Sequence, residues 1–268
     1  PGFKDIENPV VSEASEVYSA DSVQLGRFFS ENRTPVEYNE ISPVLIHTLI
    51  DTEDERFYHH HGVDFKGLFA AVKDMARGRA RGASTITQQL AKNLFRVRTQ
   101  YSTGLLGYIP GVKLLVMKAK EWIVAIKLEI IFNKEEILTM YLNTVDFGSN
   151  SFGIKTAARS YFGTTPDKLT HEQSAVLVGL LKATSSYNPR INPRNSLSRR
   201  NTVLDLVYAH GHLTVDGKVA TRGQLDSIKA LPIQLASRHT ASSYDGQAPY
   251  FREQLVDYIN DLCEQGLV

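Results

Sequence analysis

SPVLIHTLIDTEDERFYHHHG, residues 42–62, is the stretch that decides the fold of this chain. Ser42 followed by Pro43 predicts a helix start, because serine is a favoured N-cap and proline is accommodated at the first helical position. The apolar residues that would share the buried face of this helix are Val44, Leu45, Leu49 and Ile50. The helix would run into Glu53 and place that carboxylate at or near its C-terminal end.

A second stretch, GASTITQQLAKN at residues 82–93, joins a glycine-containing turn to another helix. Thr85 and Gln88 have the spacing of a capping box, with Ser84 as an alternative cap. The helix would bury Ile86, Leu90 and Leu94 on one face and carry Gln89, Lys92 and Arg96 on another. An acid followed by a helix start that can bind an anion suits a reaction that moves a sugar away from a phosphate.

Most of the remaining chain has the periodicity of helices. Residues 1–40 look extended, and the turn residues Ala20, Asp21 and Ser22 predict a hairpin or an edge strand there. Further helices are expected over residues 64–78, 118–132, 135–143, 153–163, 174–183, 196–211 and 248–262. The predicted fold class is mainly α with a small β element near the N-terminus. Three parts are expected, at 1–41, 42–216 and 217–268.

Two stretches between residues 97 and 132 have different textures. Residues 97–117 are apolar and rich in glycine, which fits either a buried connection or a mobile flap that rests on a lipid surface. Residues 118–132, KAKEWIVAIKLEIIF, predict an amphipathic helix with Ile123, Ile126 and Ile130 at core spacing. Lys118 and Glu121 are three residues apart on this helix and would face the same way.

The composition limits the kinds of protein that this chain could be. The chain has 268 residues, 42% of them hydrophobic and 22% charged, which is typical of a globular protein with a core. A net charge of +1 argues against general nucleic-acid binding. The single cysteine, Cys263, excludes an internal disulfide. No apolar run is long enough to span a membrane, and because the chain begins at Pro1 we expect a fragment whose anchor lies elsewhere.

Basic residues crowd into one region of the sequence: Lys73, Arg77, Arg79, Arg81, Lys92, Arg96 and Arg98. A solvated face and a site for a phosphate or an anionic headgroup are equally compatible with this pattern.

Five blocks in order resemble the peptidoglycan glycosyltransferases, glycosyltransferase family 51. They are EDERFYHHHG, GASTITQQLAKN, KAKEWIVAIKLE, KEEILTMYLN and GIKTAARSYFG. The resemblance implies a lysozyme-like, mainly helical domain at 42–216 that lies against the outer face of the cytoplasmic membrane. Such a domain polymerises lipid II into glycan strands by inverting transfer and releases undecaprenyl diphosphate. The flanks resemble those of class A penicillin-binding proteins, so 217–268 would be a linker and the start of an absent transpeptidase region. A stand-alone glycosyltransferase is the alternative.

The resemblance also implies roles for individual residues. Glu53 would be the general base on the 4-hydroxyl of the acceptor sugar. Glu121, the second family carboxylate, would orient lysines or a divalent ion. The substrate-binding positions implied are Asp54, Phe57, His60, Gly82, Ser84, Thr85, Gln88, Gln89, Lys92, Asn93, Lys113, Lys118 and Lys120. Among them, the lysines would bind the diphosphate, with backbone N–H groups near Ser84 to Ile86 as a further anion cradle.

This chain departs from the family pattern in the third block. The usual Arg-Lys pair is Met117-Lys118 here, so one guanidinium is missing, and a lysine does not reproduce its planar fork. The loop before the block carries extra apolar residues, and Lys113 is the best substitute for the family's loop arginine.

Metal and cofactor needs follow from the same residues. Three consecutive histidines, His59 to His61, cannot all face one ion on a regular element, so no zinc site is predicted and His60 is expected to be structural. No tightly bound cofactor is expected, and Mg²⁺ or Mn²⁺ at the diphosphate is left open.

Two other functions compete with polymerisation. A hydrolase of the same fold would also use a glutamate, as an acid, but would not need lysines aimed at a diphosphate. The Gln-Gln-x-x-Lys pattern at Gln88, Gln89 and Lys92 separates the two. The third class is a non-catalytic scaffold that binds lipid II or other cell-wall synthesis proteins, which the missing arginine keeps open.

Overall fold

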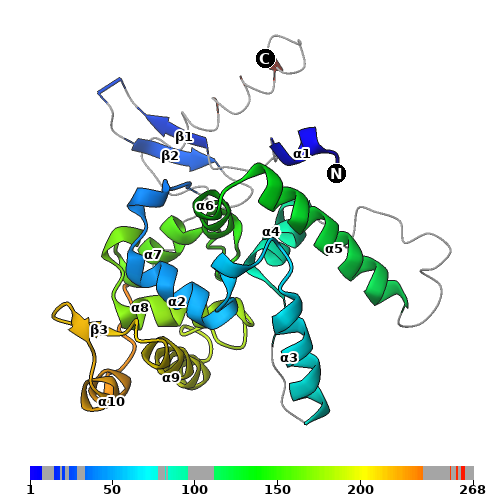
Figure 1. The fold of residues 1–268 in the computed structure, drawn as a ribbon. Helices are drawn as coiled ribbons and strands as arrows, with labels where there is room; N and C mark the ends of the chain where they lie inside the picture. Colours follow the sequence, from blue (N-terminus) through cyan, green and yellow to red (C-terminus); the bar gives the residue numbers. More distant parts are fainter. Residues whose placement is uncertain are drawn as a thin grey trace.

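A computed structural model describes residues 1–7, 15–18, 20–21, 24–28, 34–77, 82, 84–95 and 112–237, together with positions 254, 258, 261 and 262 (Figure 1). The α-helices are α1 (Phe3–Glu7), α2 (Pro43–Glu53), α3 (Phe65–Ala76), α4 (Ile86–Phe95), α5 (Val112–Ile131), α6 (Lys134–Thr144), α7 (Ile154–Phe162), α8 (His171–Leu181), α9 (Pro193–Ala209) and α10 (Arg222–Ala230). The short 3-10 helices are η1 (Tyr38–Glu40), η2 (Phe57–His59) and η4 (Pro166–Lys168). The strands are β1 (Ser15–Tyr18), β2 (Gln24–Phe28), β3 (Thr214–Val215) and β4 (Lys218–Val219).

The prediction of a mainly α fold with a small N-terminal β element is confirmed. β1 and β2 form an antiparallel hairpin in which Ser15 pairs with Phe28. A second, shorter hairpin of β3 and β4 follows α9 and was not expected.

The helices begin where their local sequence specifies. The Ser42 hydroxyl accepts a hydrogen bond from the Val44 N–H, with Pro43 in the first turn, as predicted for α2. Asn133 and Glu136 form a capping box at α6, and Thr170 and Gln173 form another at α8. These caps depend on neighbouring residues only, so they follow from sequence.

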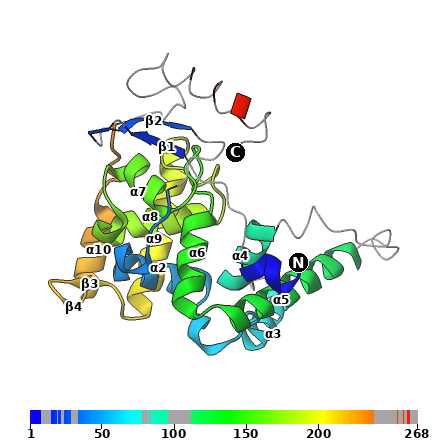
Figure 2. The same cartoon turned by 90° about the horizontal axis from the view of Figure 1, so that it is seen from above.

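Packing divides the helices into two groups. In both views α3, α4 and α5 lie on one side, α7 to α10 lie on the other, and α6 stands between them (Figures 1 and 2). α8 is the centre of the larger group, because every residue from Ser174 to Leu180 is buried and α2 and α9 pack against it. α4 packs on α5 and α6, which brings the two predicted functional stretches to the junction between the groups.

The prediction for the buried face of α5 is wrong. Ile123, Ile126 and Ile130 are exposed, whereas Val124, Ala125 and Leu128 fill the core. An α-helix that is apolar on several faces has more than one stripe at core spacing, so periodicity alone could not identify the stripe that packs.

The stretch expected to be a connection or a flap lies mostly outside the described residues. Residues 97–111 are not among the described residues. Residues 112–117 form the first turns of α5, although their sequence was predicted to be too broken for a helix. None of the helices described is long and apolar enough to cross a bilayer.

A buried arginine ties α10 to α9. The Arg200 guanidinium is 1% exposed and donates to the carbonyls of Lys229 and Leu231, at 2.8 Å each. It therefore satisfies carbonyl groups that the end of α10 leaves unpaired. The hydrophobic cluster that contains α9 also includes Leu225, which lies beyond the expected domain boundary between residues 216 and 217. The boundary itself stays a prediction.

The surroundings of His171 predict a loss of stability in acid. Its Nε2 accepts a hydrogen bond from the Thr214 N–H at 3.2 Å, so the ring is neutral in this arrangement. Burial lowers the pKa of His171, Glu172 opposes that effect, and His47 adds to the lowering. The unfolded chain takes up this proton near pH 6.5 and the folded chain resists it. Stability is therefore lost as pH falls through that value.

We expect the melting temperature to fall between pH 7.5 and pH 5.5, and His171→Gln to flatten this dependence. Thermal unfolding followed by circular dichroism at several pH values measures both. His61→Gln, at an exposed histidine, is the matched control and should keep the wild-type slope. A wild-type melting temperature that is constant or rises on acidification would contradict the assignment.

Candidate active site

Glu53 is the last residue of α2, as predicted, and its half-buried carboxylate is bonded by a side chain of α4 that α6 supports in turn. Gln89 of α4 donates from Nε2 to Glu53 Oε2 at 3.0 Å. The Tyr141 hydroxyl of α6 donates to Gln89 Oε1 at 2.9 Å. Within the part of the chain that the structure describes, the second oxygen of Glu53 takes no hydrogen bond, so it is available to accept a proton.

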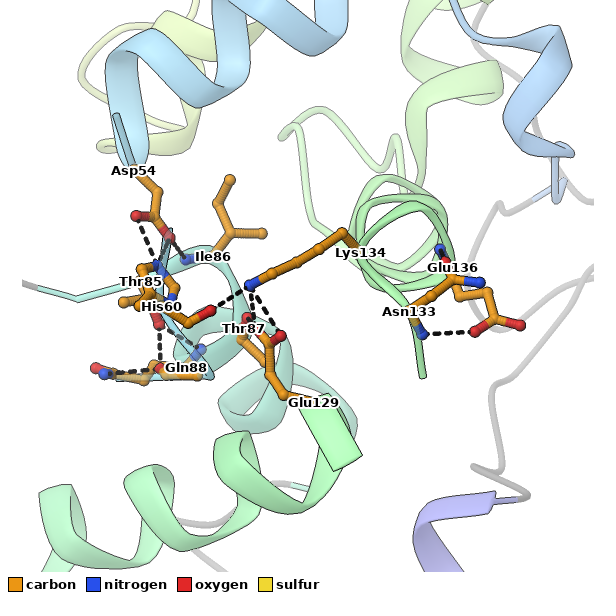
Figure 3. A network of polar contacts seen from close by, with 11 residues as sticks. Asp54, His60, Thr85, Ile86, Thr87, Gln88, Glu129, Asn133, Lys134 and Glu136 are labelled. Atoms are coloured by element: carbon orange, nitrogen blue, oxygen red, sulfur yellow. Dashed lines mark hydrogen bonds and ion pairs between the residues drawn. The ribbon is translucent and has the colours of Figure 1, made fainter. Parts of the chain in front are cut away.

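Asp54, the next residue, is buried and faces the start of α4 (Figure 3). Its carboxylate lies 3.0 and 3.1 Å from Nε2 of the buried His60 ring. It also accepts the backbone N–H of Ile86, the first residue of α4, at 3.0 Å. Asp54 thus caps α4, a helix more than 30 residues further along the chain. Its carboxylate satisfies a backbone N–H group that the helix itself leaves unpaired.

The carbonyl oxygen of Gly62 accepts hydrogen bonds from two side chains at the start of α4. Thr85 Oγ1 donates to it at 2.6 Å and Gln88 Nε2 at 3.2 Å, and all three residues are buried. The Gln88 N–H bonds to Thr85 Oγ1 at 3.2 Å. The capping box expected for Thr85 and Gln88 is therefore half formed, because the glutamine side chain turns to Gly62 instead of the Thr85 N–H.

Gly62 itself cannot carry a side chain. Its φ is +83°, and an added Cβ would lie 2.7 Å from the Ala125 carbonyl carbon of α5. Glycine is needed here for its left-handed backbone and for the close approach to α5.

A half-buried lysine, which the sequence interpretation missed, joins three elements at this point (Figure 3). Lys134 Nζ, at the start of α6, donates to the His60 carbonyl at 2.7 Å and pairs with Glu129 of α5 at 2.8 Å. It also lies 4.3 Å from the centre of the Phe57 ring, a cation–π contact. Glu129 accepts the Thr87 hydroxyl of α4 at 2.6 Å. A glutamate inside the apolar run KLEIIF was the available signal, since such a residue needs a partner when buried.

Lys118 and Glu121 face the same way, as predicted, on α5. Lys118 Nζ lies 2.7 Å from Glu121 Oε2 and donates to Ser84 Oγ at 3.0 Å. Glu121 is 1% exposed, whereas the Lys118 side chain is about one-third exposed. Ser84 directly precedes Thr85 and α4, so the cationic group is anchored to the same helix start as the network around Gly62.

The structure brings some of the predicted site residues together and leaves others apart. Glu53 meets Gln89, and Lys118 meets Ser84 and Glu121. A buried polar network brings together Asp54, His60, Thr85 and Gln88, with Phe57 against its lysine. Gly82, Lys92 and Asn93 are exposed, and Lys120 is partly exposed. Lys113 belongs to α5, and its side chain lies outside the described residues.

A single short stretch contacts both Glu53 and Lys118. Ser84 bonds Lys118 and Gln89 bonds Glu53, and these two residues are close in sequence, because Ser84 lies just before α4 and Gln89 lies in its first turn. A carboxylate that can take a proton and an ammonium that can bind an anion are thus positioned by one rigid element.

Comparison with known proteins identifies the family. A family model described as Transglycosylase matches residues 21–208. Penicillin-binding protein 1A of Escherichia coli (strain K12) is 36% identical over 242 residues, which covers 90% of this chain and 26% of that protein. Penicillin-binding protein 1F of Bacillus subtilis (strain 168) is 35% identical over 222 residues, 82% of this chain and 29% of that protein.

Penicillin-binding protein 1A of Aquifex aeolicus (strain VF5) is 36% identical, over 80% of this chain and 29% of that protein. The chain thus spans between a quarter and a third of the length of these relatives. Because the family model matches more than half of the sequence, the chain belongs to the transglycosylase family.

Proposed function

We propose that this chain is a peptidoglycan glycosyltransferase that polymerises lipid II into glycan strands during cell wall synthesis. Family membership supports the reaction class, and one observation carries the assignment to residues. Gln89 of α4 bonds Glu53, and Ser84, two residues before α4, bonds Lys118, so one short stretch of chain holds both side chains. A polymerase needs both, because one group must take a proton and another must stabilise a departing diphosphate.

Glu53 removes the proton in this proposal. The 4-hydroxyl oxygen of the acceptor GlcNAc attacks C1 of the donor MurNAc as its proton passes to the free oxygen of Glu53. A new C1–O4 bond forms on one face, and the bond from C1 to the diphosphate breaks on the other. The lipid diphosphate leaves with the bonding electrons, and the configuration at C1 inverts from α to β.

Side chains, not the helix start, bind the diphosphate. The N–H groups of Ile86 and Gln88 are already bonded to Asp54 and Thr85. One N–H group of the expected anion cradle, that of Ile86, is therefore already bonded within the protein, which favours side chains as the ligands of the diphosphate. Lys118 is the best placed cation, because Glu121 and Ser84 fix its ammonium group, and Lys92 and Lys120 are the further candidates.

The buried network positions these groups without needing to touch substrate. Asp54 and His60 hold the start of α4, and Thr85 and Gln88 dock it on Gly62. We therefore assign a positioning role to these four predicted substrate-binding residues.

A resident metal does not fit the residues of this site. No group of three His, Cys, Asp or Glu side chains among the described positions could hold an ion. Glu121 is already paired with Lys118. A divalent cation that arrives with the diphosphate stays a prediction, and no step here passes through it.

A lipid II polymerisation assay tests the proposal. The protein is incubated in detergent with lipid II and, separately, with finished glycan, with and without Mg²⁺. Growth of polymer supports the glycosyltransferase. Breakdown of finished glycan without polymer would favour the hydrolase, and binding of lipid II without either reaction would favour the scaffold.

An exposed apolar surface supports a membrane as the second partner. It consists of Phe65, Phe69, Ile123, Ile126 and Ile130, which are 40–75% exposed on α3 and α5. The Phe65 ring lies edge-on to Trp122, 6.3 Å between centroids, so the two helices meet at this surface. Apolar side chains gathered on two helices are typical of a lipid contact. The outer face of the cytoplasmic membrane is the proposed location, and other cell-wall synthesis proteins stay predicted partners.

Replacing Phe69 and Ile130 by serine should weaken binding to phosphatidylcholine vesicles roughly 30-fold, since about 2 kcal/mol of apolar burial is lost. Co-sedimentation with vesicles measures the change. Ile191→Ser with Val219→Ser is the matched control, because both residues are 62% exposed on other elements. If both double variants bound the vesicles equally well, α3 and α5 would be excluded as the lipid-binding surface.

A further inference from the structure

Tyr141 has a polar atom that core packing does not explain. The side chain is 0% exposed in the middle of α6, among the residues of the main hydrophobic core. A phenylalanine would fill the same space, so the hydroxyl needs a reason of its own. Its partner is Gln89 Oε1 at 2.9 Å, and Gln89 in turn bonds Glu53. The hydroxyl therefore sits one amide away from the proposed base.

The chemistry of the three groups fixes the direction of both hydrogen bonds. Burial raises the pKa of Tyr141 well above its usual range, and the negative charge of Glu53 adds to the rise. The hydroxyl thus stays protonated and donates. A carboxylate only accepts, so the amide between them must turn its oxygen to Tyr141 and its NH₂ to Glu53.

We propose that Tyr141 is a positioning residue for the base, because its hydroxyl locks the Gln89 amide with the NH₂ group toward Glu53. The inference rests on the proposed function in so far as Glu53 must be an ionised, oriented carboxylate. The lock supplies both properties. A donated hydrogen bond favours the ionised form, and it holds one oxygen while the other faces the acceptor.

Loss of the hydroxyl frees the amide to turn over. In Tyr141→Phe the buried Gln89 oxygen has no donor, which is costly, and rotation of the amide would bring that oxygen to Glu53. Two acceptors can share a contact only if a proton lies between them. Glu53 would then hold a proton at higher pH than in the wild type, and a protonated carboxyl cannot act as a base.

The decisive measurement is the pH profile of polymerisation by Tyr141→Phe. We expect the acid limb of kcat/KM to move up by about one pH unit, which matches the free energy of one hydrogen bond. At pH 6 kcat falls about tenfold, KM for lipid II stays unchanged, and the loss shrinks at pH 8.5. Tyr161→Phe is the matched control. That tyrosine is also 0% exposed and bonds the Phe147 carbonyl at 2.9 Å, so its loss should lower stability without moving the limb.

A second readout does not depend on activity. Carbon-13 NMR of labelled glutamate carboxyl groups, with Glu53→Gln to assign the resonance, follows the titration of Glu53 in both proteins. An upward shift in Tyr141→Phe supports the lock even if the wild type polymerises nothing. A wild-type protein that forms no polymer would count against the proposed function alone.

A double variant covers the case in which Tyr141→Phe is poorly folded. Tyr141 acts through Gln89, so adding Tyr141→Phe to Gln89→Met should change the titration of Glu53 no further. Additive shifts in the double variant would overturn the proposal. An unchanged acid limb and an unchanged titration in a folded Tyr141→Phe would overturn it as well, and would leave Tyr141 as a packing residue.

Discussion

Glu53→Gln is expected to abolish lipid II polymerisation, with a loss of about three orders of magnitude or more, while the protein stays folded. The amide is isosteric with the carboxyl group, and its oxygen can still accept from Gln89 Nε2, the bond that is 3.0 Å long in the wild type. What disappears is the ability to take a proton. Base assistance in enzymes typically contributes two to four orders of magnitude in rate, which sets the expected size.

The experiment compares the rate of glycan formation from lipid II with lipid II binding and thermal unfolding for the same variant. Glu55→Gln is the matched control. That residue is two positions away, its side chain is 41% exposed, and it lies 3.6 Å from His210 Nε2. Near-wild-type polymerisation by Glu53→Gln would exclude this residue as the base, and loss of binding together with rate would assign it to substrate affinity.

Asp54→Ala is expected to lower the free energy of unfolding by about 3 kcal/mol, or roughly 6–12 °C in melting temperature. The substitution leaves the Ile86 N–H and the His60 ring without their shared acceptor, and both lie in the buried network. Activity measured well below the melting temperature should also fall, because the start of α4 carries Ser84 and Gln89 into place.

Urea and thermal unfolding measure this change. Asp226→Ala is the control, because Asp226 forms an exposed pair with Arg222 and such pairs contribute little. If Asp54→Ala keeps the wild-type stability and loses activity, Asp54 acts on the substrate, as the family resemblance implied, and not on α4.

The sequence predicts the parts of this fold that depend on near neighbours. The Ser42 cap of α2 and the Asn133–Glu136 box of α6 involve residues two or three apart, so the pattern contains all the information needed. The end of α7 at Gly163 is of the same kind, since its φ of 64° favours glycine. Which face of α5 packs depends instead on the helix α4 that lies against it, and the isoleucine stripe was placed inside wrongly.

The candidate site shows the same division. The residue types of Glu53, Lys118 and Glu121 are visible in the sequence blocks, and the contact between Lys118 and Glu121 follows from helical spacing. The partners of Asp54, Thr87 and Gln89 lie 32 to 52 positions away, at Ile86, Glu129 and Tyr141. Such pairs arise only when α2, α4, α5 and α6 come together, and for that reason the buried network and the contact of Tyr141 with Gln89 could not be predicted from the sequence.

The stretch from Ser84 to Gln89 has a consequence for drug resistance. Its side chains hold α4 on Gly62, fix the Lys118 ammonium group and orient the Glu53 carboxylate, so each has a structural duty besides any contact with a ligand. A compound that bound these side chains would leave few escape mutations, because a change that weakened its binding would also disturb the start of α4 or the proposed base.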